Sequence, residues 1–179
     1  MKPFWGISLA VFLLLSSCQW HNKNDVARIV YKWQDKKIKI PAGILSYKTM
    51  GRDTVCVDIW DKPFKIFTYV DSVGCTSCQL GLPKWKTLID SCVLEKMNIG
   101  FIFVVHSSDY QDFERALDHF EFNYPVIYDH TNAFEKLNRF PTAPFRTFLL
   151  DKDNKVQVTG SPIDNPSLWL LYKKAISGK

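Results

Sequence analysis

Two cysteines separated by two residues, with a proline shortly after them, stand in the stretch DSVGCTSCQLGLP at residues 71–83. Cys75 and Cys78 at this spacing suit three kinds of chemistry: a structural cross-link, half of a metal site, and a dithiol that exchanges disulfides with a partner. The spacing alone does not choose among the three. The choice depends on the elements that hold the pair.

The elements on either side of the cysteines have clear patterns. Residues 64–70, FKIFTYV, are aromatic and β-branched, which predicts a buried central strand. After the pair, apolar residues recur three or four positions apart up to about residue 96, which predicts a helix with Leu82, Trp85, Leu88, Ile89 and Cys92 on its inner face. Residues 98–106, NIGFIFVVH, predict a second strand that is covered on both faces.

The rest of the chain continues this alternation. It predicts a helix after residue 108, a strand at 124–129, a short helix at 132–138, a hairpin at 147–160 and a closing helix at 165–176. Before residue 61, short β-rich pieces predict an N-terminal β extension over residues 28–60, with strands at RIVYKW, KIKI, GILSY and TVCVDIW. We therefore expect one α/β domain over residues 28–179, with its core at 61–179. Three layers, α/β/α, would surround a mixed sheet.

This order places the cysteine pair at the carboxyl end of a central strand and at the start of the following helix, where sites of open α/β sheets concentrate. The N–H groups and dipole of a helix start favour an anionic sulfur and lower the pKa of a thiol. Cys75, the first of the two, is the expected nucleophile. Cys78, one turn later, is expected to attack the mixed disulfide and release the partner.

The motif GCTSCQLGLP, with YPVIYD and TFLLDKDNKV downstream, resembles the thioredoxin-like family, and within it the exported thiol-disulfide oxidoreductases of the TlpA/ResA type. The resemblance covers residues 64 to the C-terminus, and Pro83 matches the proline that kinks the active-site helix of that family. It implies an inserted strand and helix at residues 99–121. It also implies a redox-active disulfide, Cys75–Cys78, with no separate cofactor, and protein thiols or disulfides as substrates.

The same resemblance implies a cis-proline opposite the cysteines, just before a hairpin strand. In APFRTFLLD, Pro144 stands one residue earlier than the proline of the family and Phe145 takes its place, so both are candidates for the substrate groove. Gly81 stands where the related reductases carry a glutamate that handles protons. His106, at the end of the second strand, and Asp71 are candidates for a replacement base, although a histidine at a strand end is usually structural.

The N-terminus predicts export. Lys2 precedes an apolar stretch that is short for a bilayer span, which is typical of a secretory signal peptide at residues 1–17. The join LSSC resembles a bacterial lipobox, which implies that Cys18 is acylated and becomes the mature N-terminus. Residues 18–27 then form a polar tether. We expect a lipid anchor in the bacterial cell envelope, facing the periplasm, and a membrane redox partner.

In an oxidising compartment, Cys56 and Cys92 could form a disulfide or stay as two unpaired thiols, and unpaired thiols are the simpler interpretation.

The net charge of +5 comes from 23 basic and 18 acidic side chains that are mixed along the chain, so no nucleic-acid site is predicted. No second CxxC completes a metal site, and no metal is expected. Two alternatives to the oxidoreductase stay open: a peroxiredoxin-like peroxidase using Arg146, and a binding module with a structural disulfide.

Overall fold

A computed structural model of the chain describes residues 24–43, 45–55, 58–71, 80–163 and 165–178. The chain divides into two compact units, residues 1–33 and residues 34–179, so the second begins six residues after the predicted domain start at residue 28. The first unit contributes a described helix at residues 24–33. Cys18, Cys56, Cys75 and Cys78 lie outside the described residues. Within the described ranges, no helix has both the length and the apolar character that crossing a membrane requires.

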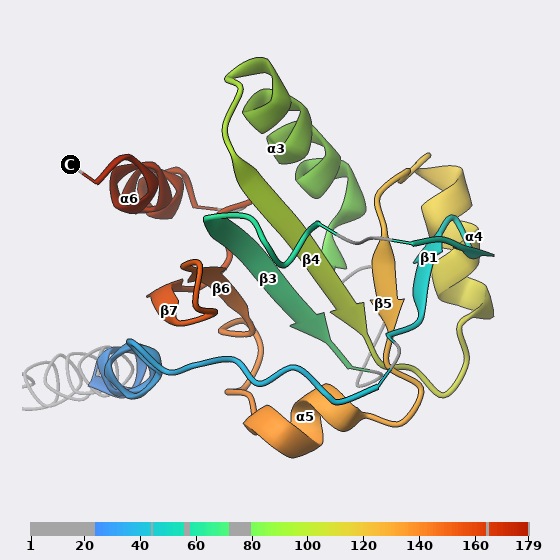
Figure 1. Ribbon diagram of the computed structural model, residues 1–179, viewed down its shortest axis with the longest axis horizontal. Helices are drawn as coiled ribbons and strands as arrows, with labels where there is room; N and C mark the ends of the chain where they lie inside the picture. The colour runs from blue at the N-terminus through green and yellow to red at the C-terminus, as the bar shows by residue number, and fades with distance from the viewer. Residues whose placement is uncertain (1–23, 44, 56–57, 72–79, 164, 179) are drawn as a thin grey trace, which may run out of the picture. The chain divides into compact units, whose positions relative to one another are not determined.

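The second unit is built on a mixed sheet in the order β2-β1-β5-β4-β3-β6-β7 (Figure 1). Its strands are β1 (Tyr47–Thr49), β2 (Arg52–Asp53), β3 (Phe64–Val70), β4 (Ile99–Val105), β5 (Val126–Tyr128), β6 (Thr147–Leu150) and β7 (Val156–Thr159). The central strands β3, β4 and β5 are parallel, and the strands on both flanks are antiparallel. The mixed sheet predicted from the sequence is confirmed.

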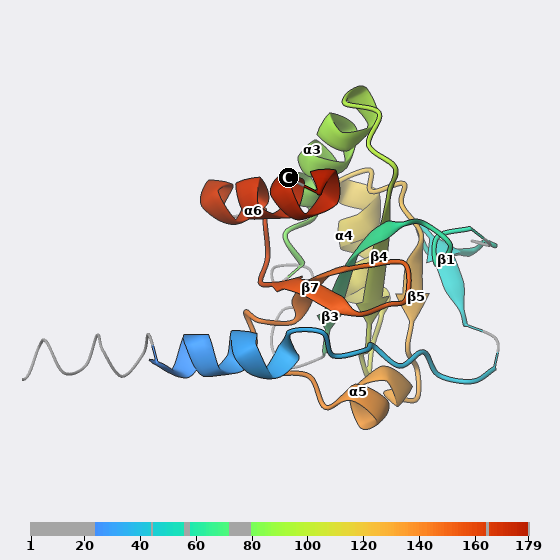
Figure 2. The same cartoon turned by 60° about the vertical axis from the view of Figure 1, so that its left-hand side comes forward.

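Helices cover both faces of this sheet, as Figures 1 and 2 show. They are α3 (Leu82–Leu94), α4 (Gln111–His119), α5 (Ala133–Asn138) and α6 (Pro166–Ser177). On one face, Ile66 and Phe103 of the sheet join a core cluster with Trp85 of α3 and Leu117 of α4. On the other face, the ring of Phe67 lies 5.9 Å from that of Phe134 in α5. The three-layer α/β/α architecture is therefore confirmed.

The N-terminal β extension is only partly correct. The strand predicted at residues 28–33 is a helix that starts at residue 24, because Val26, Ile29, Val30 and Trp33 repeat at the spacing of one helical face. The TVCVDIW strand predicted at 54–60 is not a strand in its described part, where residues 58–61 turn back into β3. What remains is the β1–β2 hairpin, which pairs with β5. Met50 and Gly51 form its two-residue turn with φ of 49° and 73°.

The KIKI segment is a single bridge at Lys37 rather than a strand. The backbone of residues 35–38 follows the outer edge of β7, where the Ile38 N–H donates to the Asn154 carbonyl at 2.9 Å. The buried Asn138 amide then pairs with both backbone groups of Lys39, at 2.8 and 2.9 Å. These bonds hold a short edge segment in place and leave less of the edge strand unpaired.

A buried lysine ties the amino end of β3 to two turns. Lys65 has no exposed surface, and its ammonium group donates to the carbonyls of Trp60 and Lys152, each at 3.2 Å. Burial lowers the pKa of Lys65, while Asp151, Asp153 and Asp61 oppose the shift. The lysine thus joins the 58–63 turn to the β6–β7 turn across the start of the central strand.

We predict that Tyr172 makes folding sensitive to alkaline pH. Its hydroxyl group is fully buried and donates to the Gly160 carbonyl at 2.7 Å, and burial raises its pKa above the ordinary 10.0. An unfolded tyrosine ionises near pH 10 while the folded one stays protonated, so the free energy of unfolding should fall as pH rises above 10. Tyr172→Phe should lower that free energy by about 1 kcal/mol at pH 7 and make the alkaline decline shallower.

Urea unfolding followed by circular dichroism between pH 7 and 11 measures both effects. Tyr31→Phe is the matched control, since Tyr31 is 86% exposed and should leave both quantities unchanged. An unaltered alkaline slope in Tyr172→Phe would assign the pH dependence to other groups.

Candidate functional site

The segment that carries the cysteine pair connects the carboxyl end of β3 to α3. The described chain stops at Asp71, just after β3, and resumes at Leu80 before α3 begins at Leu82. Cys75 and Cys78 fall between these points, outside the described residues. The strand before them and the helix after them are where the sequence predicted, and Pro83 lies in the first turn of α3.

A cavity of about 270 Å³ lies at this end of β3, lined by Thr68, Tyr69, Trp85, Ala143, Pro144, Arg146, Thr147, Ser161 and Ile163. Its lining combines the last part of β3, the inner face of α3 and the loop before β6. The Ala143–Pro144 peptide bond is cis, so the cis-proline position falls on Pro144 itself and not on Phe145. Pro144 is exposed at the cavity, whereas Phe145 is half-buried and does not line it.

Arg146 joins this loop to the end of β3. Its Nε donates to the Pro141 carbonyl at 2.7 Å, and its Nη1 forms an ion pair with the Asp71 carboxylate. The side chains are only 20% and 17% exposed, so solvent screens the pair less than a surface ion pair. The guanidinium carbon also lies 5.7 Å from the centre of the Tyr69 ring, within the range of a cation–π contact.

Tyr69 is a fixed donor in the wall of the cavity. Its hydroxyl group donates to the Asn132 side-chain oxygen at 2.7 Å, and its ring stacks on Phe140 with centres 4.7 Å apart. Burial raises the pKa of Tyr69, and the charges of Glu135 and Asp71 raise it further. The phenol therefore stays protonated at neutral pH and keeps its hydrogen bond.

The two candidate bases named from the sequence both have partners. Asp71 pairs with Arg146, and His106 Nδ1 lies 2.7 Å from the Asp129 carbonyl oxygen. A carbonyl only accepts, so Nδ1 carries the proton and Nε2 is the acceptor of the neutral ring. The two Asp129 carboxylate oxygens accept the N–H groups of Ala133 and Phe134 at 2.8 and 2.9 Å. His106 is thereby linked to the start of α5.

Gly81 has a backbone conformation that favours glycine. It caps α3 with φ 62° and ψ 46°, in the left-handed region that favours glycine. A Cβ atom built on it would also lie 3.1 Å from Ile163 Cδ1. An acidic side chain at this position would need a different start to the helix.

Cys92 is a free thiol and faces the core, as predicted. Burial raises its pKa to about 11, with Glu95 adding to the shift and Lys173 opposing it, so it is almost entirely protonated at neutral pH. Among the described residues, no group of three or more His, Cys, Asp or Glu side chains is placed to hold a metal ion.

The sequence missed the ion pair that shapes the cavity. Asp71 and Arg146 are 75 positions apart, and only the antiparallel pairing of β3 with β6, which sets Thr68 opposite Thr147, brings them together. A search for complementary charges just beyond paired strand ends would have found them. Ser161 and Ile163 were also missed, because they follow β7 on an irregular segment.

A comparison with solved structures finds the same architecture. A protein described as a thiol:disulfide interchange protein DsbE, from Chlorobium tepidum, matches with a TM-score of 0.60 at 20% identity, over 80% of this chain and 99% of that one. A thiol:disulfide interchange protein from Bacteroides sp. matches with a TM-score of 0.55 at 11% identity, over 74% and 86%. The thioredoxin domain of a thiol-disulfide oxidoreductase from Bacteroides vulgatus matches with 0.51 at 12%, over 77% and 99%.

No family model and no curated protein matches the chain. The structural likeness establishes a thioredoxin-like fold, which confirms the fold that the CxxC motif and its neighbours led us to expect.

We predict that Gly81 is required for its backbone angles more than for its size. Gly81→Ala should lower the free energy of unfolding by about 1–2 kcal/mol, the cost of a left-handed residue with a Cβ. Gly81→Asn should cost less, because asparagine tolerates this region. Both variants bring a Cβ toward Ile163, so the contact is matched and their difference reports the backbone. Chemical denaturation measures it, and equal losses would assign the cost to the contact instead.

Proposed function

We propose that the chain is a lipid-anchored thiol-disulfide oxidoreductase of the bacterial cell envelope, with Cys75 as nucleophile and Cys78 as resolving cysteine. The main support is the thioredoxin-like fold together with the place of CTSC between β3 and α3. A segment that leaves a parallel strand at its carboxyl end and enters a helix is a favourable place for a thiolate. The adjoining cavity, with Pro144 at its edge, offers space for an extended client chain.

In the proposed reaction, the Cys75 thiolate attacks one sulfur of a client disulfide. The client S–S bond breaks, a Cys75–client disulfide forms, and the other client sulfur leaves as a thiolate that takes up a proton. Cys78 then loses its proton and attacks the Cys75 sulfur, which releases the second client sulfur. The client gains two electrons and two protons, and the Cys75–Cys78 disulfide holds the oxidised state. A membrane thiol-disulfide partner would return the two electrons, and the same steps reversed would oxidise a client.

The residues around the cavity have supporting roles in this proposal. The ion pair of Arg146 with Asp71 fixes the loop that carries Pro144 against the end of β3. Tyr69, held by Asn132, gives that wall a rigid aromatic face. Gly81 supplies no carboxylate, so proton transfer at Cys78 would pass to water or to another group at this edge, for which His106 Nε2 is a candidate.

The two cysteines should behave differently when each is replaced. Cys78→Ser should accumulate disulfide-linked complexes between Cys75 and client proteins, because the resolving thiol is missing. Cys75→Ser should accumulate few. Expression of both variants in the native host, alkylation of cell lysates and non-reducing electrophoresis measure the difference. Cys92→Ser is the matched control, since that buried thiol should not affect trapping. Equal trapping by the Cys75 and Cys78 variants would contradict the assigned roles.

The redox potential of the Cys75–Cys78 pair tests the alternative of a binding module with a structural disulfide. A catalytic pair should titrate reversibly above about −300 mV and reduce insulin disulfides. A lower potential without reductase activity would favour the structural disulfide. Rapid peroxide consumption that needs Cys75 but not disulfide clients would favour the peroxidase.

The lipid anchor is tested separately at Cys18. Cys18→Ser should abolish incorporation of radiolabelled palmitate and move the protein from the membrane fraction to the soluble fraction. Cys56→Ser, which keeps the lipobox, is the control and should leave both readouts unchanged. Membrane retention without label in Cys18→Ser would instead indicate an uncleaved signal anchor.

A further inference from the structure

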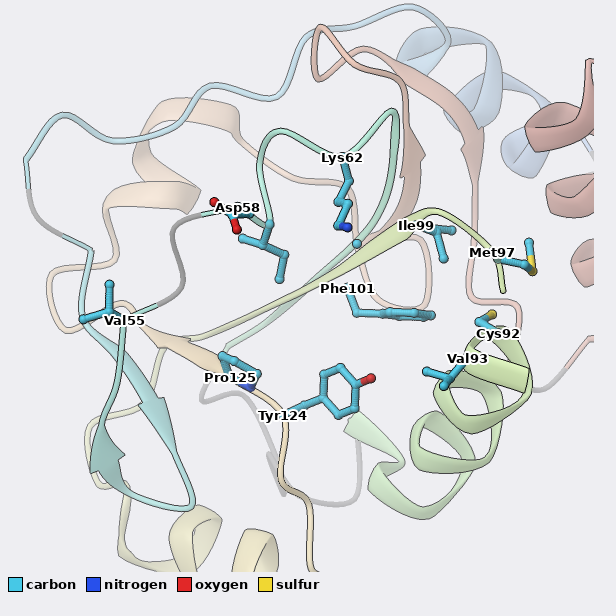
Figure 3. A pocket seen from close by; sticks show the side chains of 12 residues that line it. Val55, Asp58, Lys62, Cys92, Val93, Met97, Ile99, Phe101, Tyr124 and Pro125 are labelled. Carbon is cyan, nitrogen blue, oxygen red and sulfur yellow. The ribbon is translucent and has the colours of Figure 1, made fainter. Parts of the chain in front are cut away.

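A second and larger cavity lies at the opposite edge of the sheet from the cavity at the end of β3. It measures about 420 Å³ and is lined by Val55, Asp58, Ile59, Lys62, Cys92, Val93, Met97, Ile99, Gly100, Phe101, Tyr124 and Pro125 (Figure 3). These residues come from the turn before β3, the end of α3, the start of β4 and the approach to β5. Because parallel strands begin at this edge and end at the other, this cavity is separate from the cavity at the end of β3.

The walls of the cavity are set by core packing. Gly100 lies so close to the 58–62 turn that a Cβ would be 2.9 Å from the Ile59 carbonyl oxygen. Lys65 fixes the same turn through the Trp60 carbonyl. On the other side, the Phe101 and Tyr124 rings meet edge to face with centres 6.2 Å apart. The cavity is therefore held open by buried contacts, while the exposed Val55 and Val93 mark an opening to solvent.

The chemistry of the lining is mostly apolar with few polar groups, as in sites for small ligands. Figure 3 shows the Lys62 ammonium group and the Tyr124 ring on opposite sides of the Phe101 ring in that view. Lys62 supplies a positive charge beside apolar lining residues such as Phe101, which suits a ligand with an anionic group on an apolar skeleton. Asp58, the one carboxylate of the described lining, repels anions, so a ligand with one negative charge is favoured over a ligand with two.

The size of the cavity limits the ligand. One water molecule occupies about 30 Å³ in the liquid, so the 420 Å³ cavity corresponds to roughly fourteen water molecules, which is space for a small ligand. A flat ring would suit the aromatic wall, where ring pairs gain about 0.5–1.5 kcal/mol beyond their buried area. We propose that the cavity binds an arylalkyl monocarboxylate, with its ring against Phe101 and Tyr124 and its carboxylate on Lys62.

Methionine methyl groups provide a direct test on the full chain. The chain has methionines at positions 1, 50 and 97, of which Met97 lines the cavity and Met50 lies in the β1–β2 turn. With ¹³C-methyl-labelled methionine, 4-phenylbutyrate should shift the Met97 signal in a saturable way and leave the Met50 signal in place. Met97→Leu identifies the signal. The neutral analogue 4-phenylbutan-1-ol should bind at least roughly tenfold more weakly, because it lacks the charge that Lys62 recognises.

Two lysine variants complete the test. Lys62→Met keeps the apolar stem and should weaken 4-phenylbutyrate binding roughly tenfold. Lys39→Met removes the same charge from an exposed side chain outside the lining and should bind like the unaltered protein. An unmoved Met97 signal at millimolar 4-phenylbutyrate, equal binding of the alcohol, or equal binding by Lys62→Met would each overturn the proposal. None of these readouts depends on Cys75 or Cys78, so the result stands apart from the redox function.

Discussion

Seven consecutive residue pairs join β3 to β4 in parallel, from Phe64 with Ile99 to Val70 with Val105, and this pairing organises the whole second unit. Parallel neighbours must be linked by a crossover, so α3 has to run back along one face of the sheet. Nearly all residues of both strands are buried, so the pair contributes a large part of the apolar core. Because the two strands run parallel, both end at the same edge of the sheet, where Asp71 and His106 follow them.

The two edges of the sheet thereby acquire different chemistry. At the carboxyl edge, Arg146 and Asp71 join the loop before β6 to the end of β3, and the smaller cavity lies at this end of β3. At the amino edge, the buried Lys65 donates hydrogen bonds to the 58–63 turn and to the β6–β7 turn. The larger cavity is lined in part by the 58–62 turn. A buried lysine is tolerated there because two carbonyl oxygens replace part of its hydration.

Backbone geometry sets two features of the carboxyl edge, at Gly81 and at Pro144. Gly81 has left-handed backbone angles before α3, and a Cβ built on it would lie 3.1 Å from Ile163 Cδ1, so a side chain there meets a backbone cost and a close contact. The Ala143–Pro144 bond is cis, and the Phe145 N–H donates to the Thr142 carbonyl at 3.0 Å. The wall at this edge is polar and aromatic, with Tyr69 and Arg146 among its residues.

The sequence by itself determined the order of the core elements, because apolar periodicity reports burial directly: FKIFTYV and IGFIFVV are strands, and the Trp85 to Cys92 stripe is the inner face of a helix. It also identified the thioredoxin-like fold and a core-facing Cys92. It failed at RIVYKW, where a helical stripe with β-branched residues resembles a strand. It also failed in the described part of TVCVDIW, where residues 58–60 form a turn despite their β propensity. Only the tertiary structure decided that the cis bond precedes Pro144, that Arg146 pairs with Asp71, and that Lys62 and Phe101 line one cavity. The ion pair and the cavity join residues that are distant in sequence, and the strand register and loop packing that bring them together leave no local pattern in the sequence.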